Sequence, residues 1–580
     1  MLDIIIKGGY VIDGSGSPRQ KADVGIRDDR IVAVGNIDED AKQTLDATGK
    51  IVAPGFIDIH THYDAQAFWD PTLSPSPFHG VTTIVGGNCG FSIAPLSANP
   101  ADGEYLKRML ARVEGMPLES LNAGVPWDWT SFGSFLDKLD GTLAINAGFM
   151  VGHCAIRRTV MGERAVGNEA TPEELAEMEA LLRTSIAEGG LGFSSTVSPT
   201  HNDLDGHPVP SRAASIEELT ALASIVSEYQ GTSLEILPGV GAFTEDQKEW
   251  MTNLSIAANR PLNWNLLAPN SAHPEMVEAQ LSAGDYAKER GGKIVALTPP
   301  QVINLRINLV SGFLFDTLPE WPAVVGLPLA ERLEAIKDPA IRAKLEAAPK
   351  DAPASFARMF VWENLKINET FAEANKQYEG MTVGEYAEVV DKKPFDAMMD
   401  LCISDKLRTS FSPPPNGLDD ETWNMRRDVW LDDRAIVGAS DAGAHLDMID
   451  TFAFSTQLLG EGVRKRSLLT MEQAVRQLTQ VPAELYGFKD RGLIKEGNYA
   501  DLVIFDENTI ECGEVYTRHD LPNDEMRLYA DATGVEQVLV NGKVIIADGE
   551  YTNVTAGRMM RSGQDTYSVE VPAGVNREAS

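Results

Sequence analysis

Two histidines one residue apart, His60 and His62, end the apolar segment GFIDIHTH at residues 55–62. Successive side chains of a strand point to opposite faces, so both imidazoles share a face, with Asp58 two residues before them. Imidazole nitrogens bind divalent metals such as zinc, and this pair is therefore a candidate metal site. The alternative is a solvated loop, because a lone His-x-His pair is common.

Two further segments end apolar runs with side chains that could complete such a site. Cys89 follows the run Val81–Val85 in the glycine-rich sequence GGNCG, where its thiolate can bind a metal. Asp441 follows the apolar sequence AIVGAS, where a carboxylate can bind a metal and take a proton from water. The alternatives are a buried thiol that only packs and an aspartate that caps a helix.

The elements that must position these residues alternate in a way typical of a (β/α)8 barrel. The expected strands span residues 55–62, 81–86, 144–152, 191–196, 232–237, 261–267, 293–298 and 435–441. Helical patterns lie between most of them; one begins with Thr171 as cap, Pro172 at the first helical position and Glu174 closing a capping box. The active site of such a barrel lies at the carboxyl ends of its strands, where the candidate ligands are found.

Both ends of the chain have the composition of short strands. Residues 1–53 and 484–580 contain β-branched runs separated by turns, including an Asn541-Gly542 hairpin signal. We expect these ends to form one small β-domain beside a barrel that spans residues 54–483. The stretch from about residue 300 to 430 is too long for one connection and predicts a helical insertion.

Charge and cysteine content exclude several classes of protein. The 580 residues include 50 Lys plus Arg and 85 Asp plus Glu, which gives a formal net charge of −35. Such an acidic chain repels phosphate backbones and anionic lipid, so we expect neither nucleic-acid nor membrane partners. Four scattered cysteines and the lack of a long apolar segment predict a cytoplasmic protein without a disulfide framework. A small-molecule substrate is expected.

Taken together, the segments resemble the amidohydrolase superfamily, and more closely its D-aminoacylase branch, over nearly the whole chain. The resemblance is carried by IVAPGFIDIHTHYD, VGGNCGFS, VGHCAIRRTVMGE, GGLGFSS, SDAGAH and DRGLIKEGNYADLVIFD. It implies a distorted (β/α)8 TIM barrel flanked by a composite β-sandwich, often in a homo-oligomer. It also implies zinc-dependent hydrolysis of an amide by metal-bound hydroxide. His60, His62, Cys89 and Asp441 match the metal ligands of the branch, and Asp441 also matches its general base.

The chain departs from this branch at strands five and six. The branch places a histidine ligand at the end of each strand, whereas this chain has Glu235 in GTSLEILPG and Asn265 in RPLNWNLLAPN. Three outcomes stay open: one zinc ion on the remaining ligands, replacement ligands at Glu235 or Asn265, or no catalytic metal. Counting the ligands favours one ion over two.

The residues with which the branch holds a substrate carboxylate, a tyrosine after strand four and a lysine in strand six, are also missing. His153, His201 and His445 are candidates for contact with the substrate, and a structural hydrogen bond or solvent exposure is the alternative. We predict a metal-dependent hydrolase of an amide C–N bond. The alternatives are hydrolysis of a cyclic amide, lactone or ester, and a binding or scaffolding relative that has lost its full metal site.

Overall fold

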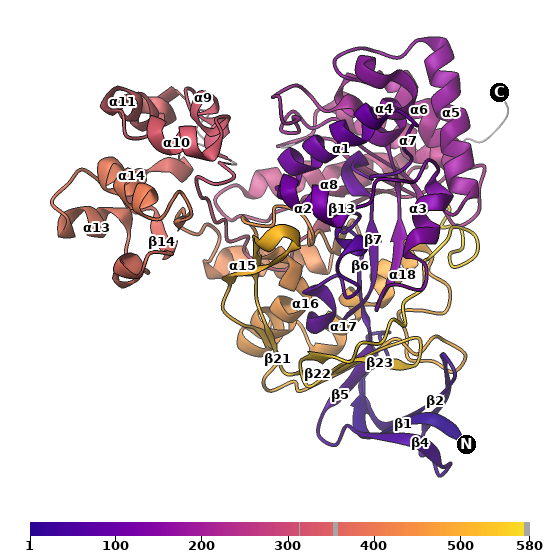
Figure 1. Cartoon of the computed structure of the whole chain (residues 1–580). Helices are drawn as coiled ribbons and strands as arrows, with labels where there is room; N and C mark the ends of the chain where they lie inside the picture. Colours follow the sequence, from indigo (N-terminus) through magenta and orange to yellow (C-terminus); the bar gives the residue numbers. More distant parts are fainter. Residues whose placement is uncertain (240, 313, 352–357, 573–580) are drawn as a thin grey trace.

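The computed structural model describes residues 1–239, 241–312, 314–351 and 358–572, and the fold is a mixed α/β structure (Figure 1). Two parallel sheets lie at its centre. The first has the order β6 (Phe56–Asp58), β7 (Val81–Gly86) and β8 (Asn146–Phe149). The second has the order β16 (Ala435–Val437), β13 (Ile294–Thr298), β12 (Leu262–Asn265), β11 (Ser233–Leu237), β10 (Gly192–Thr196) and β9 (Val151–Gly152).

The two sheets are joined at both of their sides. On one side β8 continues into β9 through Met150, whose N–H donates to the Gly86 carbonyl at 2.9 Å. On the other side Thr61 and Ala442 form a parallel bridge, and the His62 N–H donates to the Ala442 carbonyl at 2.8 Å. Each of the eight segments expected to form a strand contains a strand of these sheets. Because neighbouring strands are parallel, their carboxyl ends face the same side.

Helices cover the outside of these strands, and every residue of β10, β11, β12 and β13 is buried. The covering helices include α5 (Pro172–Ala187), α6 (Ile216–Val226), α7 (Glu245–Ala258) and α8 (Pro274–Glu289), in the upper part of Figure 1. The predicted start of α5 is confirmed: the Thr171 side chain accepts from the Glu174 N–H, and the Glu174 carboxylate accepts from the Thr171 N–H. Strands buried on both faces are typical of a parallel sheet that is covered by helices.

Strands from both ends of the chain share one nine-stranded sheet, at the foot of Figure 1. Its members are β1 (Leu2–Val11), β2 (Gln20–Arg27), β3 (Arg30–Gly35), β4 (Ala41–Asp46), β5 (Ile51–Pro54), β17 (Leu502–Phe505), β22 (Val535–Val540), β23 (Lys543–Ala547) and β24 (Glu550–Tyr551). The two ends meet where β5 pairs antiparallel with β17. Asn541 and Gly542 join β22 to β23 with positive φ angles of 46° and 75°, as the predicted hairpin turn requires.

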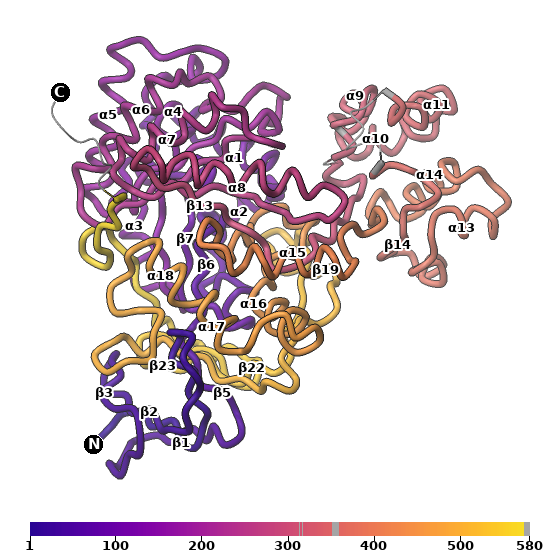
Figure 2. The backbone as a smooth tube through the Cα atoms, turned by 180° about the vertical axis from the view of Figure 1, so that it is seen from behind, coloured from indigo at the N-terminus to yellow at the C-terminus, as the bar shows by residue number. Residues whose placement is uncertain are grey.

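The segment between β13 and β16 forms helices where the sequence predicts an insertion. Its helices include α9 (Pro322–Val325), α10 (Leu329–Ala335), α11 (Pro339–Ala347), α13 (Val383–Val389) and α14 (Pro394–Ser404). They surround their own hydrophobic cluster, in which Trp321, Trp362 and Phe411 are buried. Figures 1 and 2 show this unit standing to one side of the parallel strands.

One part of the C-terminal region belongs to the nine-stranded sheet, and another part lies against the parallel strands. After β24, Met559 forms a bridge with Ala147 in β8, and Thr566 forms a bridge with Phe488. Residues 484–580 were expected to belong to the terminal β-domain as a whole, but only part of them joins its sheet; residues 557–560 lie against β8. Gly557 permits the approach, since a β-carbon there would lie 2.0 Å from the Ile145 carbonyl oxygen. Residues 573–580 of that expected domain lie outside the described residues.

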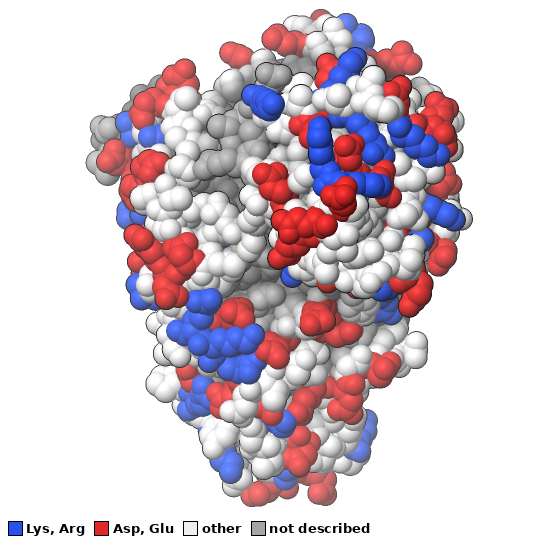
Figure 3. All heavy atoms as spheres, turned by 90° about the vertical axis from the view of Figure 1, so that its left-hand side faces the viewer, with Lys and Arg blue, Asp and Glu red and all other residues white. Residues whose placement is uncertain are grey.

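The visible face in Figure 3 carries acidic and basic side chains interspersed over many elements. Within the described part of the chain, no helix is long and apolar enough to cross a lipid bilayer. Cys89, Cys154, Cys402 and Cys512 are all free thiols. The cytoplasmic location stays a prediction from the sequence.

Gly87, in the turn before Cys89, packs closely against the backbone of Met150, and a substitution at this glycine can test the contact. Its φ is 72°, and a β-carbon would lie 2.3 Å from the Met150 carbonyl oxygen. We predict that Gly87→Ala loses about 1–2 kcal/mol of unfolding free energy to the left-handed backbone and about 1–3 kcal/mol more to the clash. Gly49→Ala is the control, since its φ is 77° but nothing lies within 4 Å of the added carbon. Equal losses of thermal stability in the two variants, followed by circular dichroism, would contradict the close approach.

Candidate metal and active site

His60 and His62 follow β6 directly and are buried, with exposed fractions of 0% and 3%. Their ring centroids lie 5.4 Å apart. Thr61 faces the other way, because its N–H and its hydroxyl both donate to the Val85 carbonyl, at 3.0 and 2.9 Å. The two imidazoles therefore share the face that strand alternation predicts.

A buried hydrogen-bond network fixes these histidines against the segment after β16. The Ser440 hydroxyl contacts an Asp58 carboxylate oxygen at 2.6 Å and the His60 carbonyl at 3.1 Å. It also accepts from the Ala442 N–H at 3.0 Å. Burial raises the pKa of Asp58 to about 7, against the effect of the Ser440 hydrogen bond. This network joins β6 to the segment after β16, next to the two histidines.

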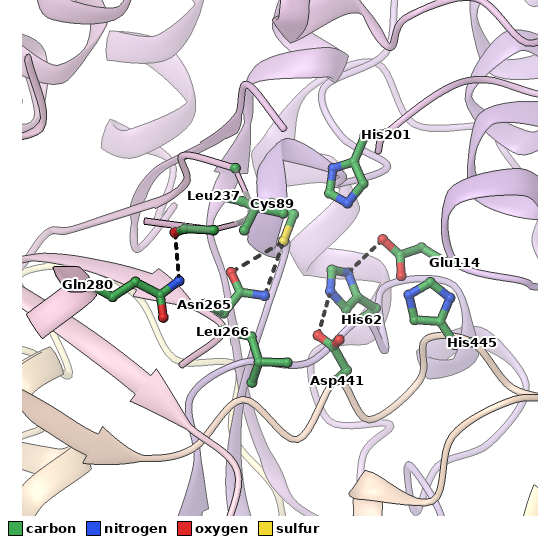
Figure 4. A pocket seen from close by; sticks show the side chains of 12 residues that line it. His62, Cys89, Glu114, His201, Leu237, Asn265, Leu266, Gln280, Asp441 and His445 are labelled. Carbon is green, nitrogen blue, oxygen red and sulfur yellow. Dashed lines mark hydrogen bonds and ion pairs between the residues drawn. The ribbon is translucent and has the colours of Figure 1, made fainter. Parts of the chain in front are cut away.

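Asp441 contacts both imidazoles, and Figure 4 shows its carboxylate beside His62. Its Oδ1 is 3.2 Å from His60 Nε2 and 3.5 Å from His62 Nε2. Burial raises the pKa of Asp441, but its hydrogen bonds to the two histidines outweigh burial and hold the pKa well below its usual range. Asp441 has a φ of 51°, an uncommon backbone conformation for a residue with a β-carbon. The segment after β16 thus aims this carboxylate at both histidines.

Cys89 also reaches this group. Its Sγ lies 3.6 Å from His60 Nε2, and the candidate ligand atoms of His60, His62 and Cys89 all lie within 4.8 Å of one another. Burial and the nearby carboxylate of Glu235 raise the pKa of the Cys89 thiol well above its usual value. A bound cation would oppose this effect and favour the thiolate.

Asn265 is the last residue of β12, as the sequence predicts, whereas Glu235 lies in the middle of β11 and not at its tip. Both side chains approach Cys89. One Glu235 carboxylate oxygen accepts from the Cys89 N–H at 2.8 Å, and the other lies 4.0 Å from Sγ. The Asn265 side chain lies 3.8 Å from Sγ and 3.1 Å from His60 Nε2. The two residues therefore lie beside Cys89 and offer side-chain oxygen atoms where the resemblance implies imidazoles.

Glu114 is part of the site although its sequence context gave no signal for it. It follows α1 (Pro100–Val113), far from any strand tip in the sequence, and is buried with an exposed fraction of 3%. Its Oε1 lies 3.3 Å from His62 Nδ1. Burial lowers the pKa of His62, but Glu114 and Asp441 outweigh burial and raise it to about 9. The carboxylates of Glu114 and Asp441 therefore favour a positive charge at this place.

The three substrate-contact candidates have different positions. His201 and His445 line the same cavity as His62 and Asp441 (Figure 4). His153 does not line the cavity. The Ser195 hydroxyl and the Glu218 carboxylate each lie 2.8 Å from one of its two ring nitrogens, so both nitrogens already have protein partners. The expectation that His153 contacts the substrate therefore does not fit the geometry.

The cavity has a volume of about 250 Å³. Its lining includes the last residues of β11 and β12, residues that follow other strands, and Gln280 of α8. Two carboxylates line it, Asp441 and Glu114, and no Lys or Arg is among its described lining residues. Two imidazoles, a thiol and a carboxylate are the donors that zinc takes in proteins. The residues present therefore fit a divalent cation by donor type, proximity and charge.

Comparison with known proteins shows the family to which the chain belongs. The amidohydrolase family matches residues 43–546. A D-aminoacylase from Alcaligenes xylosoxydans xylosoxydans is 26% identical over 96% of this chain and 97% of its own length. An N-acyl-D-glutamate deacylase from the same organism is 27% identical over 97% of this chain and 96% of its own length.

Solved structures show the same fold. A D-aminoacylase structure has a TM-score of 0.64 at 24% identity and covers 97% of this chain and 100% of its own. An N-acyl-D-glutamate deacylase from Bordetella bronchiseptica, complexed with zinc and a phosphonate mimic of the tetrahedral intermediate, has a TM-score of 0.62 at 23% identity. It too covers 97% of this chain and 100% of its own. The chain thus belongs to the amidohydrolase family, in its D-aminoacylase-like branch, and is a hydrolase that acts on carbon–nitrogen bonds other than peptide bonds.

Proposed function

We propose that this protein is a zinc-dependent deacylase that hydrolyses the amide C–N bond of a small N-acyl compound. The observation that carries the proposal is the convergence of His60, His62, Cys89 and Asp441 beside one cavity. The printed names of the relatives, D-aminoacylase and N-acyl-D-glutamate deacylase, support the reaction class.

We further propose that the parallel strands close into a distorted (β/α)8 barrel, with the terminal sheet forming part of a composite β-sandwich. The Thr61–Ala442 bridge and the continuation of β8 into β9 support closure, since they join the two parallel sheets at both sides. In such a barrel the loops at the carboxyl ends of the strands form the active site.

His60, His62 and Asp441 are proposed to hold one zinc ion, with Cys89 as a further ligand. A second ion beside Cys89 would depend on Glu235 and Asn265, and Glu235 already accepts a hydrogen bond from the Cys89 N–H. This favours one ion over two, with Glu235 and Asn265 as supporting oxygen donors. When bound, the ion supplies Lewis acidity for the amide carbonyl and lowers the pKa of a bound water molecule.

Asp441 is the proposed general base. A carboxylate whose pKa lies below its usual range is ionised at neutral pH and can accept the proton of an attacking water. The water oxygen forms a bond to the carbonyl carbon, the C–N bond breaks, and the proton held by Asp441 passes to the leaving nitrogen. His201 and His445 line the same cavity and are proposed to contact the substrate.

Asp441→Asn tests the general base. We predict that kcat falls by about 10²–10⁴-fold, because the amide cannot accept the proton. The circular dichroism spectrum should be unchanged. Asp433→Asn is the matched control, since this exposed aspartate lies outside the cavity and should leave kcat unchanged. Retention of wild-type kcat by Asp441→Asn would rule out the assigned base.

Glu114→Ala tests how the site holds its cation. The Glu114 carboxylate can accept the Nδ1 proton of His62, which leaves the Nε2 lone pair directed toward Asp441. We predict that zinc affinity, measured by competition with a chromogenic chelator, weakens by about 10–100-fold. Glu114→Gln should restore part of it, because its side-chain oxygen still accepts. Glu104→Ala, at an exposed position on α1, is the control; an affinity loss equal to that of Glu114→Ala would contradict the role.

A further inference from the structure

The charges around the cavity bear on which substrate it accepts. Asp441 and Glu114 are the acidic side chains in the lining, and Glu235 is buried behind Cys89. No lysine or arginine is among the described residues that line the cavity. Arg212 donates to the carbonyl of the lining residue His201 at 2.9 Å and to the Asn202 side chain at 2.7 Å. It is therefore engaged by protein groups.

The proposed zinc ion would not leave a surplus positive charge for an anion. Two lining carboxylates, Asp441 and Glu114, already offset the two charges of a divalent cation. Burial lowers the pKa of His201 to about 3, so its imidazole is neutral at neutral pH. A substrate carboxylate beside the scissile amide would lose its hydration in this cavity without gaining a cationic partner.

The remaining polar lining groups suit uncharged partners. Asn265 and Gln280 are side-chain amides, and the Gln280 amide donates to the Gly241 carbonyl at 3.0 Å. Leu237 and Leu266 supply apolar surface. The whole chain also carries a formal net charge of −35, which disfavours the approach of anions at low ionic strength.

We propose that the amine portion of the substrate is uncharged or cationic and carries no free carboxylate next to the scissile amide. The substrate class is then an N-acyl amine, such as an N-acyl amino acid amide, rather than an N-acyl amino acid anion. This inference rests on the proposed deacylase function and specifies its substrate.

A matched pair of compounds tests the inference. N-acetyl-methionine and N-acetyl-methioninamide share their acyl group and side chain and differ only in a carboxylate against a carboxamide. Each is assayed as the D and the L enantiomer with zinc-loaded enzyme, by following release of the free amine. For the accepted enantiomer, we expect kcat/KM for the amide to exceed that for the acid by at least about tenfold. An equal or higher kcat/KM for the acid would overturn the inference while supporting the deacylase function.

A charge introduced into the lining gives a second test. Gln280→Lys places an ammonium group in the cavity, and it should raise the acid-to-amide ratio of kcat/KM by about tenfold or more. Gln280→Met has similar volume without the charge and should leave that ratio unchanged. An unchanged ratio in Gln280→Lys, with the variant folded by circular dichroism, would count against the charge argument.

Failure of the proposed function is distinguishable from failure of the inference. If neither compound releases an amine, the deacylase proposal fails for this class, and binding then decides the inference. Isothermal titration of the zinc-loaded protein should give tighter binding of the amide than of the acid. Tighter binding of the acid would overturn the inference.

Discussion

The contact between the segment after β6 and the segment after β16 determines the rest of the site. Ser440 bonds to Asp58 and to the His60 carbonyl, and the His62 N–H bonds to the Ala442 carbonyl. These bonds join the first and last parallel strands, and they bring Asp441 to within 3.5 Å of both imidazoles. His60 and Ser440 are 380 positions apart in the chain, and they meet because the segments after the first and last parallel strands pair with each other.

The carboxylates around His60, His62 and Cys89 favour the binding of a cation there. Asp441, Glu114 and Glu235 lie close to two imidazoles and a thiol, and Glu114 and Glu235 are buried. Uncompensated buried carboxylates are costly, and they either take up protons or bind a cation. Burial raises the pKa of Glu114 to about 7 and that of Glu235 to about 8, the first of these responses. A divalent ion on His60, His62 and Asp441 would provide the second.

Much of this arrangement could be predicted from the sequence, for identifiable reasons. Period-two alternation indicated that His60 and His62 share a face, and apolar runs located the strand ends at or after which Cys89, Asn265 and Asp441 lie. Glu235 was expected at such an end and lies in the middle of β11. The structure brings these residues together. Glu114 could not be predicted, because it follows a helix and meets His62 only through the tertiary fold.

His153 was predicted to contact the substrate, but its position in the structure differs. It follows a strand, as the ligands do, but its ring is held by Ser195 and by Glu218, which also bonds to the buried Arg157. Nothing in the local sequence VGHCAIRR reveals these partners, since Glu218 is 65 residues away. The contact of the segment after β24 with β8 could not be predicted either, because the local sequence does not reveal which distant residues a segment will pair with.

The proposed binding of one divalent ion by His60, His62 and Asp441 can be checked by the metal content of the protein. The measurement is zinc per chain by inductively coupled plasma mass spectrometry, on protein purified without chelators and then dialysed, for the wild type and for His60→Ala/His62→Ala. The account predicts about one zinc ion per wild-type chain and nearly none in the double variant. A wild-type protein that hydrolyses an amide while nearly metal-free, or a double variant that keeps its full zinc content, would contradict it.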